Sequence, residues 1–181
     1  MTVNYREVIK ENCEKHSPVK WWPRFAFHYT DLANAVSVLS CGKLYSRISA
    51  EVLGLMANDN ACRQVIDITR SSAKASVRFY FRPLTPTQYY NEGFKHPALR
   101  YDGDMNANVP VPIFLLFDLE KLLSMPGVKF SESSQSGHGC KLCDSVEEFA
   151  QFEFDKIYSA GWSENFDELK RYRHAEIIVS G

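Results

Sequence analysis

Apolar residues switch between strand-like and helix-like spacing along the chain, and the clearest switch lies near residue 30. The aromatic run FAFHY predicts a strand at about residues 24–29. Gly42 stands where helices commonly end, and the hydroxyl of Thr30 can accept an amide of a first helical turn. The pattern predicts a helix at 31–41 with Thr30 as its N-cap, because four apolar residues recur there at helical spacing: Leu32, Ala35, Val36 and Leu39.

The rest of the chain predicts short strands with short helices between them. Strands are expected in VRFYF, which Pro83 and Pro86 terminate, and in VPIFLLFD, VKFS and HAEIIV. VPIFLLFD is a continuous apolar run with the length of a buried strand. Short helices are expected in residues 1–20, ISAEVLGLM, ACRQVIDITRSS and LEKLLS, and SVEEFAQFEFDKIY predicts one amphipathic helix. We therefore expect an α+β fold in a single domain, residues 1–181.

Composition narrows the class of protein. The chain has 181 residues, of which 45% are hydrophobic and 24% charged, values typical of a globular domain. Its apolar runs are far shorter than the ~20 residues of a membrane span, and residues 1–24 lack the apolar stretch of a signal peptide. Five irregularly spaced cysteines favour a reducing compartment over a disulfide framework. We expect a cytoplasmic protein that does not contact membranes.

Charge is distributed unevenly, although the net charge is only −1. Residues 61–82 hold five basic residues against Asp67, a local charge of +4, and residues 144–168 hold eight acidic residues against Lys156, a local charge of −7. A basic segment can steer a polyanion such as a nucleic acid to one face of the protein. Alternatively, the two segments pair on a solvated surface. The charges alone do not separate these interpretations.

Two short stretches carry candidate chemistry. His28, Tyr29 and Thr30 end a strand at a helix N-terminus, where backbone amides are free and can bind an amide or the hydroxyls of a nucleotide. Glu176 lies in the otherwise apolar RHAEIIV, and a carboxylate in such a strand is costly to bury unpaired. Glu176 is therefore expected either at the rim of the fold or as a residue that takes part in a reaction. Both stretches also have a structural interpretation, as a helix cap with a core tyrosine and as a structural glutamate.

A metal site is not expected. Cys140 and Cys143 in HGCKLC have a spacing that suits zinc, and His138 is close. A closed zinc site needs four ligands, and the other cysteines form no second pair. Free thiols in a flexible loop are the simpler interpretation. The chain also lacks the P-loop, the G-x-G-x-x-G fingerprint, H-E-x-x-H and G-x-S-x-G.

Four stretches together resemble the DarT toxins, which are ADP-ribosyltransferases that modify bases of single-stranded DNA. In order, they are FHYTDLANAVSVLSCGKLYSR, VRFYFRPLTPTQYYNEG, VPIFLLFDLEKLL with VKFSES, and RHAEIIV. The second stretch is similar to a family strand with an aromatic-Tyr-Phe and Ser/Thr-Pro pattern, the third to the central strand, and the last to the strand of the catalytic glutamate. The resemblance covers about residues 25–179, so residues 1–23 are an N-terminal extension.

The resemblance implies an ADP-ribosyltransferase fold in which a split antiparallel β core with inserted short helices surrounds an NAD cleft. It implies that His28, Tyr29 and Thr30 contact the nicotinamide end of NAD+, and that Ser37 and Tyr45 line the same substrate. The implied catalytic residues are Glu176 and Arg70. Arg70 would contact NAD+ and assist proton removal from the target base, and Arg63 is a possible substitute for it.

The function that the resemblance implies is NAD-dependent mono-ADP-ribosylation of a base in single-stranded DNA, by the toxin of a toxin–antitoxin or phage-defence system. The implied partners are single-stranded DNA and a macrodomain antitoxin of the DarG type. Helix 145–157 can serve as the docking surface for this antitoxin. The basic segment would follow the DNA backbone, through Lys74 and Arg78 among others, and Tyr89 and Tyr90 would stack on bases. An RNA target and a non-catalytic nucleic-acid-binding module are the alternatives. Family members usually continue past the catalytic strand, so a chain ending at Gly181 is expected to be truncated or a short relative.

Overall fold

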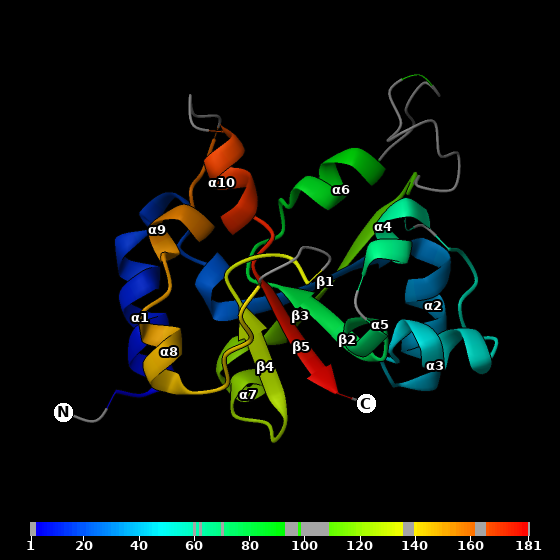
Figure 1. Cartoon of the computed structure of the whole chain (residues 1–181), viewed down its shortest axis with the longest axis horizontal. Helices are drawn as coiled ribbons and strands as arrows, with labels where there is room; N and C mark the ends of the chain where they lie inside the picture. The colour runs from blue at the N-terminus through cyan, green and yellow to red at the C-terminus, as the bar shows by residue number, and fades with distance from the viewer. Residues whose placement is uncertain are drawn as a thin grey trace.

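The structure is a computed structural model, and it describes residues 3–59, 61, 63–69, 71–92, 98, 109–135, 140–161 and 166–180. Arg70 and His138 lie outside the described residues, and so do the side chains of Arg63 and Tyr90. Figure 1 shows a central sheet with helices gathered at its two ends and along its upper edge.

The sheet is antiparallel, and its five strands lie in the order β3-β1-β2-β5-β4. In chain order the strands are β1 (Phe25–Asp31), β2 (Ser76–Tyr80), β3 (Pro112–Asp118), β4 (Val128–Ser131) and β5 (Glu176–Ser180). The first and last of the predicted strands, around His28 and Glu176, therefore belong to one sheet. The expected α+β class is confirmed.

The sheet is nearly divided between β1 and β2. β1 pairs with β3 from Phe25↔Asp118 to Asp31↔Pro112, and β2 pairs with β5 from Ser76↔Ser180 to Tyr80↔Glu176. β1 and β2 share the single residue pair Phe27↔Tyr80. Beyond that pair the two halves diverge, so backbone and side chains of both are available to a cleft. This geometry confirms the predicted split β core.

The helices are short and form two groups. Figure 1 places α2 (Leu32–Cys41), α3 (Arg47–Val52), α4 (Arg63–Ile68) and α5 (Ser71–Lys74) together at one end of the sheet. At the other end lie α1 (Tyr5–Lys15), α8 (Val146–Ala150) and α9 (Phe154–Ile157), and the short turns η1 (Ser17–Val19) and η2 (Trp22–Arg24) follow α1. The remaining helices are α6 (Pro86–Asn91), α7 (Leu119–Leu123) and α10 (Phe166–Tyr172).

Aromatic rings form the core at the end of the sheet that carries α1. Phe149 is 1% exposed and packs edge-on against Phe130, with ring centroids 5.4 Å apart, and against Phe154 at 5.0 Å. Phe154 in turn stacks on Tyr158 at 5.7 Å. Edge-to-face and offset ring pairs add to the stabilisation that burial alone provides. The aromatic core thus packs against the end of the sheet that carries α1, and the cleft lies toward the end that carries α2.

The start of α2 differs from its prediction by one residue. Thr30 remains in β1, paired with Ile113, and does not cap the helix. Asp31 is the N-cap instead, and its carboxylate accepts a hydrogen bond of 2.8 Å from the amide of Asn34. The prediction of Thr30 as the cap was therefore wrong. The predicted C-terminal glycine is correct, because Gly42 adopts φ +67 and its amide bonds to Val38.

Two further elements differ from the predictions. The expected helix at 145–157 is broken into α8 and α9, because Phe149, Phe152 and Phe154 all turn into the aromatic core and one straight helix cannot place all three there. VPIFLLFD is not a buried or central strand. As β3 it lies at an edge of the sheet, and Leu116 is 45% exposed.

Candidate active site

A cavity of about 480 Å³ opens where β1 and β2 diverge. Its wall includes the end of β1, the inner face of α2 and the segment that leads into α3. Five predicted site residues line this one cavity: His28, Tyr29, Thr30, Ser37 and Tyr45. Its volume lies within the range of pockets that bind small molecules and cofactors. The structure therefore brings together all of the described residues expected to bind NAD+.

Asn34 fastens one wall of the cavity. Its side-chain oxygen accepts hydrogen bonds from the amides of Ala57, at 2.8 Å, and Asn58, at 3.1 Å, and its side-chain nitrogen donates to the carbonyl of Asn58 at 2.8 Å. These three bonds tie the loop after α3 to the first turn of α2. Asn34 was not among the predicted site residues, although asparagine side chains often bond to backbone groups near helix starts and turns.

His28 is held in one tautomer. Its Nδ1 lies 2.9 Å from the carbonyl oxygen of Arg78 on β2. A carbonyl can only accept, so Nδ1 carries the proton and donates it. Burial lowers the pKa of His28, and the bond to Arg78 only partly opposes that effect. The imidazole is neutral at physiological pH, and Nε2 keeps a lone pair that can accept a hydrogen bond from a hydroxyl.

Tyr29 presents a phenol without a partner. Its hydroxyl is buried and forms no hydrogen bond with the part of the chain that the structure describes. Burial raises the pKa of Tyr29, and the carboxylates of Glu92 and Asp31 raise it further. The hydroxyl is therefore a neutral donor in the cavity wall, and leaving such a group unsatisfied is unfavourable until a ligand pairs with it.

Glu176 is deeply buried and paired. Its side chain is 1% exposed, and Arg78 grips it with two hydrogen bonds, from Nη2 to Oε1 at 2.5 Å and from Nε to Oε2 at 3.2 Å. The backbone amide of Gln135 adds a bond of 3.3 Å to Oε2. Although burial lowers the pKa of Arg78, the charge of Glu176 raises it well above its ordinary value. The two side chains form a buried salt bridge.

The loop after β4 supports this arrangement. Gln135 is 1% exposed, and its side-chain nitrogen donates to Ser131 Oγ at 3.0 Å and to Cys140 Sγ at 3.2 Å. Cys140 is thus a hydrogen-bonding partner of the loop that touches Glu176. Within the described residues, no group of three or more His, Cys, Asp or Glu side chains could hold a metal ion.

The predicted catalytic residues are not all placed at the cavity. Glu176 does not line the cavity, whereas Arg78 does and separates Glu176 from it. Arg70 lies outside the described residues, and so does the side chain of its possible substitute Arg63. Arg78 was missed as a site residue. Strand alternation already places Arg78 and Tyr80 on one face of β2, and the register Tyr80↔Glu176 brings Glu176 to that face.

The basic segment 61–82 is not a continuous DNA-binding surface among the described residues. Arg82 is 3% exposed, donates to the carbonyls of Ile157 and Ser159, and lies over the Trp22 ring, so its role is structural. Arg78 is paired with Glu176, and its predicted contact with the DNA backbone stays a prediction. Lys74 does line the cavity.

Comparison with known proteins decides the family. The sequence profile of the DarT family, described as ssDNA thymidine ADP-ribosyltransferase, matches residues 27–181. The chain belongs to the DarT family. This confirms the family expected from the four motifs and its enzyme class, ADP-ribosyltransferase of single-stranded DNA. A comparison with curated proteins found no matching sequence.

Solved structures of DarT proteins share the fold. The DarT of Thermus sp. 2.9 in complex with ADP-ribosylated ssDNA superposes with a TM-score of 0.68 at 17% identity, over 87% of this chain and 75% of that one. The same protein in complex with NAD+ gives 0.61 at 18% identity over the same shares. DarTG of Thermosipho africanus in complex with ADP-ribose gives 0.66 at 13% identity, over 87% of this chain and 40% of that one. Among the helices described here, none has the length and apolar character that a membrane span requires.

Proposed function

We propose that this chain transfers ADP-ribose from NAD+ to thymidine in single-stranded DNA and acts as the toxin of a toxin–antitoxin pair. The observation that carries the proposal is the shared cavity. His28, Tyr29, Thr30, Ser37 and Tyr45 line it together with Arg78, and Arg78 holds the buried Glu176. Membership of the DarT family supports an ADP-ribosyltransferase reaction in this cavity.

NAD+ has complementary groups for the cavity wall. Val38, Leu44 and Leu55 supply apolar surface for the adenine or nicotinamide ring. Lys74 supplies a cation for the diphosphate. Nε2 of His28 can accept a hydrogen bond from a ribose hydroxyl, and the hydroxyl of Tyr29 can donate one. These two polar groups, which have no partner among the described residues, would thus gain one from the substrate.

Glu176 is the proposed catalytic carboxylate. When the bond between nicotinamide and C1′ of ribose breaks, the electron pair leaves with nicotinamide and positive charge develops on the ribose. A carboxylate that accepts a hydrogen bond from the ribose 2′-hydroxyl stabilises this charge more in the transition state than in the ground state. The nitrogen of the acceptor base then bonds to C1′ and loses its proton. Arg70 is the residue that we propose to assist this proton transfer.

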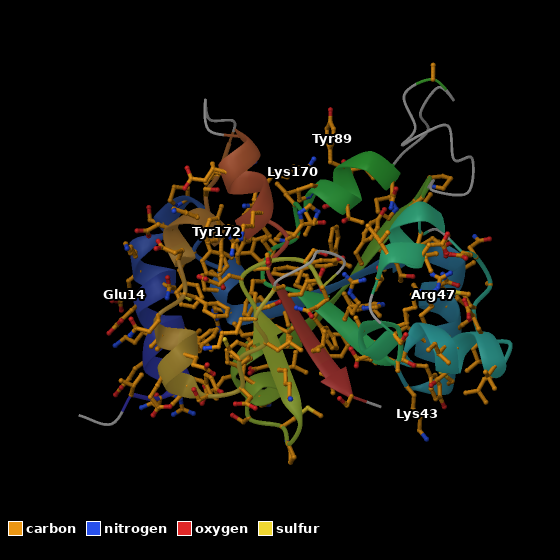
Figure 2. The ribbon with its side chains drawn as sticks, viewed as in Figure 1. Glu14, Lys43, Arg47, Tyr89, Lys170 and Tyr172 are labelled. Atoms are coloured by element: carbon orange, nitrogen blue, oxygen red, sulfur yellow. The ribbon has the colours of Figure 1, made fainter. Side chains whose placement is uncertain are left out.

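The acceptor strand is proposed to approach between α6 and α10. Thr87 and Asn91 of α6 line the cavity, as do Lys170 of α10 and His174 directly after it. Tyr89 is 55% exposed, and Figure 2 shows its ring projecting from α6 away from the rest of the molecule, where a base can stack on it. A single strand suits this site, because its bases need not be extruded from a duplex.

A macrodomain antitoxin of the DarG type is the proposed partner. A protein that modifies DNA bases needs a protein that reverses the modification. The solved structure of DarTG from Thermosipho africanus, in complex with ADP-ribose, motivates this part of the proposal. Co-expression is expected to rescue growth of cells that express this chain, and unchanged toxicity in the presence of an active macrodomain would contradict it.

The enzymatic proposal is tested with labelled NAD+ and three oligonucleotides: single-stranded DNA with thymidine, the same DNA without thymidine, and RNA of equal length. Label is expected only on the first. Glu176→Gln should lower the transfer by about 10²–10³-fold, whereas Glu120→Gln, at an exposed ion pair with Arg6, should not change it. Label on RNA favours the RNA alternative. Binding of DNA without any transfer favours a non-catalytic module and overturns the proposal.

A further inference from the structure

We infer that Arg78 is a positioning residue for the reaction: it fixes the orientation of Glu176, and a substrate hydroxyl reaches the carboxylate beside the guanidinium. This inference rests on the proposed function and adds a residue to it. Three observations lead to it, namely how the carboxylate is occupied, which edge of the guanidinium is open, and how both strands are anchored.

The carboxylate of Glu176 is almost fully occupied. Its two oxygens offer about four acceptor positions. Oε2 accepts from Nε of Arg78 and from the amide of Gln135, and Oε1 accepts from Nη2 of Arg78. One acceptor position is left, and it lies on Oε1, the oxygen that Nη2 of Arg78 holds. A ribose hydroxyl that donates to Glu176 must therefore do so next to the guanidinium.

The guanidinium has an open edge on the cavity side. Of its five N–H donors, Nε and one N–H of Nη2 are used on Glu176. Nη1 forms no hydrogen bond with the residues that the structure describes. The side chain of Arg78 is 27% exposed and lines the cavity, whereas Glu176 is 1% exposed and does not. A single hydroxyl can thus accept from Arg78 while it donates to Glu176.

Both residues are anchored by the sheet. Glu176 is paired on one side with Tyr80 of β2 and on the other with Ser131 of β4, so its backbone cannot move toward the cavity without breaking two ladders. The backbone of Arg78 is fixed by its pairing with Ile178 and by the bond between its carbonyl and His28. His28 and Arg78 therefore connect the wall of the cavity directly to the carboxylate.

Removal of the guanidinium should leave a recognisable signature. The titratable and charged groups that face Glu176 are Arg78 and Tyr80 on β2 and His174 next to β5. Without Arg78, the carboxylate would be buried with the amide of Gln135 as its one hydrogen-bond donor among the described residues, and such a group resists ionisation until the pH is raised. The activity of a variant without the guanidinium should therefore recover at alkaline pH.

The test compares Arg78→Met, Arg78→Lys and the control Arg6→Met, which removes an exposed arginine on α1. Transfer of label from NAD+ to thymidine-containing DNA is measured from pH 6 to pH 9, together with NAD+ binding by calorimetry. We expect Arg78→Met to lower kcat by about 10²-fold at pH 7, to weaken NAD+ binding by less than about tenfold, and to show a kcat that rises with pH. The wild type and Arg6→Met should share one profile.

Arg78→Lys keeps the positive charge but loses the planar guanidinium, which donates two hydrogen bonds to one carboxylate. It should keep the wild-type pH profile with a kcat at least about tenfold lower. Wild-type kcat in either folded variant overturns the inference. So does an equal loss at every pH in a folded Arg78→Met protein, which indicates a purely structural ion pair. If Arg78→Met does not fold, the kcat of Arg78→Lys decides. A wild-type protein that transfers no label refutes the proposed function instead, so the two failures are distinguishable.

Discussion

The two halves of the sheet differ in how far their polar side chains are hydrogen-bonded to other described residues. On the β1 side, Nε2 of His28 and the hydroxyl of Tyr29 have hydrogen-bonding capacity that the described part of the protein does not use. On the β2–β5 side, the carboxylate of Glu176 is held by three hydrogen bonds and shielded from the cavity. The first half has two polar groups that can pair with a ligand, whereas in the second half most of the capacity of the carboxylate is used by other described residues.

This difference separates binding from chemistry in the free protein. A buried ion pair such as Arg78–Glu176 contributes little net stability, but removing one partner is strongly unfavourable because the other charge stays buried. The β2–β5 half therefore holds the carboxylate in one place. Substitutions in the two halves should accordingly affect different measurements, kcat on one side and NAD+ affinity on the other.

The largest effect is expected from Glu176→Gln. The amide keeps the shape of the side chain but cannot stabilise the positive charge that develops on the ribose. We expect kcat for transfer to fall by about 10²–10³-fold, while the Kd for NAD+ changes by less than about threefold. Single-turnover transfer to a thymidine-containing oligonucleotide, with calorimetry for NAD+, measures both. A variant that loses NAD+ affinity as strongly as kcat would contradict the division between the halves.

The sequence predicts the site residues of the β1 half better than those of the β2–β5 half. The reason is how far apart along the chain the contacting residues lie. The strand, the turn at Thr30 and helix α2 are contiguous, so local patterns place five cavity residues together. The ion pair joins Arg78 and Glu176 across 98 positions of the chain. Arg78 lies in a segment rich in basic residues, so the sequence favours an exposed surface arginine. Its pairing with Glu176 follows only from the register of β2 and β5.

The same limit explains the errors in the fold. The apolar character of VPIFLLFD predicts burial, but the order of the strands, which no local pattern contains, puts β3 at an edge. The break between α8 and α9 follows from packing of Phe149 and Phe154 in the aromatic core. In both cases tertiary contacts decide the structure where the local pattern allows more than one outcome.

A smaller effect is expected from His28→Phe on the β1 side. Phenylalanine keeps a ring against Phe79, whose centroid lies 5.9 Å from the imidazole, but it removes the acceptor Nε2 and also the Nδ1 donor to the carbonyl of Arg78. The backbone of Arg78 keeps its pairing with Ile178, so the position of the guanidinium should change little. We expect the Kd for NAD+ to rise about tenfold, or about 1.4 kcal/mol, with kcat at saturating NAD+ lowered by less than about threefold. Calorimetry and steady-state kinetics distinguish the two effects. A large loss of kcat with unchanged affinity would assign His28 to the chemistry instead.

Tyr29→Phe should act on binding and on stability in opposite directions. The variant removes a buried hydroxyl that forms no hydrogen bond with the described part of the chain, so the free energy of unfolding should stay equal or rise by up to about 1 kcal/mol. NAD+ should bind a few-fold more weakly, because the hydroxyl would no longer pair with the substrate. Urea unfolding with and without NAD+ measures both. A destabilised free protein would indicate that the hydroxyl is satisfied without a ligand.

The smallest effect concerns stability against pH, and it compares one histidine from each half. Nδ1 of His28 donates to the carbonyl of Arg78, and Nδ1 of His174 donates to that of Lys170. Burial lowers the pKa of both imidazoles. Below a pH of about 6.5, the ordinary value for histidine, the unfolded chain binds protons that the folded protein does not, so the free energy of unfolding falls as the pH falls. Urea unfolding between pH 7 and pH 5 should show this decrease, and His174→Gln should make it shallower without changing NAD+ affinity as strongly as His28→Phe does. A decrease of equal steepness in His174→Gln would mean that other groups dominate the acid dependence.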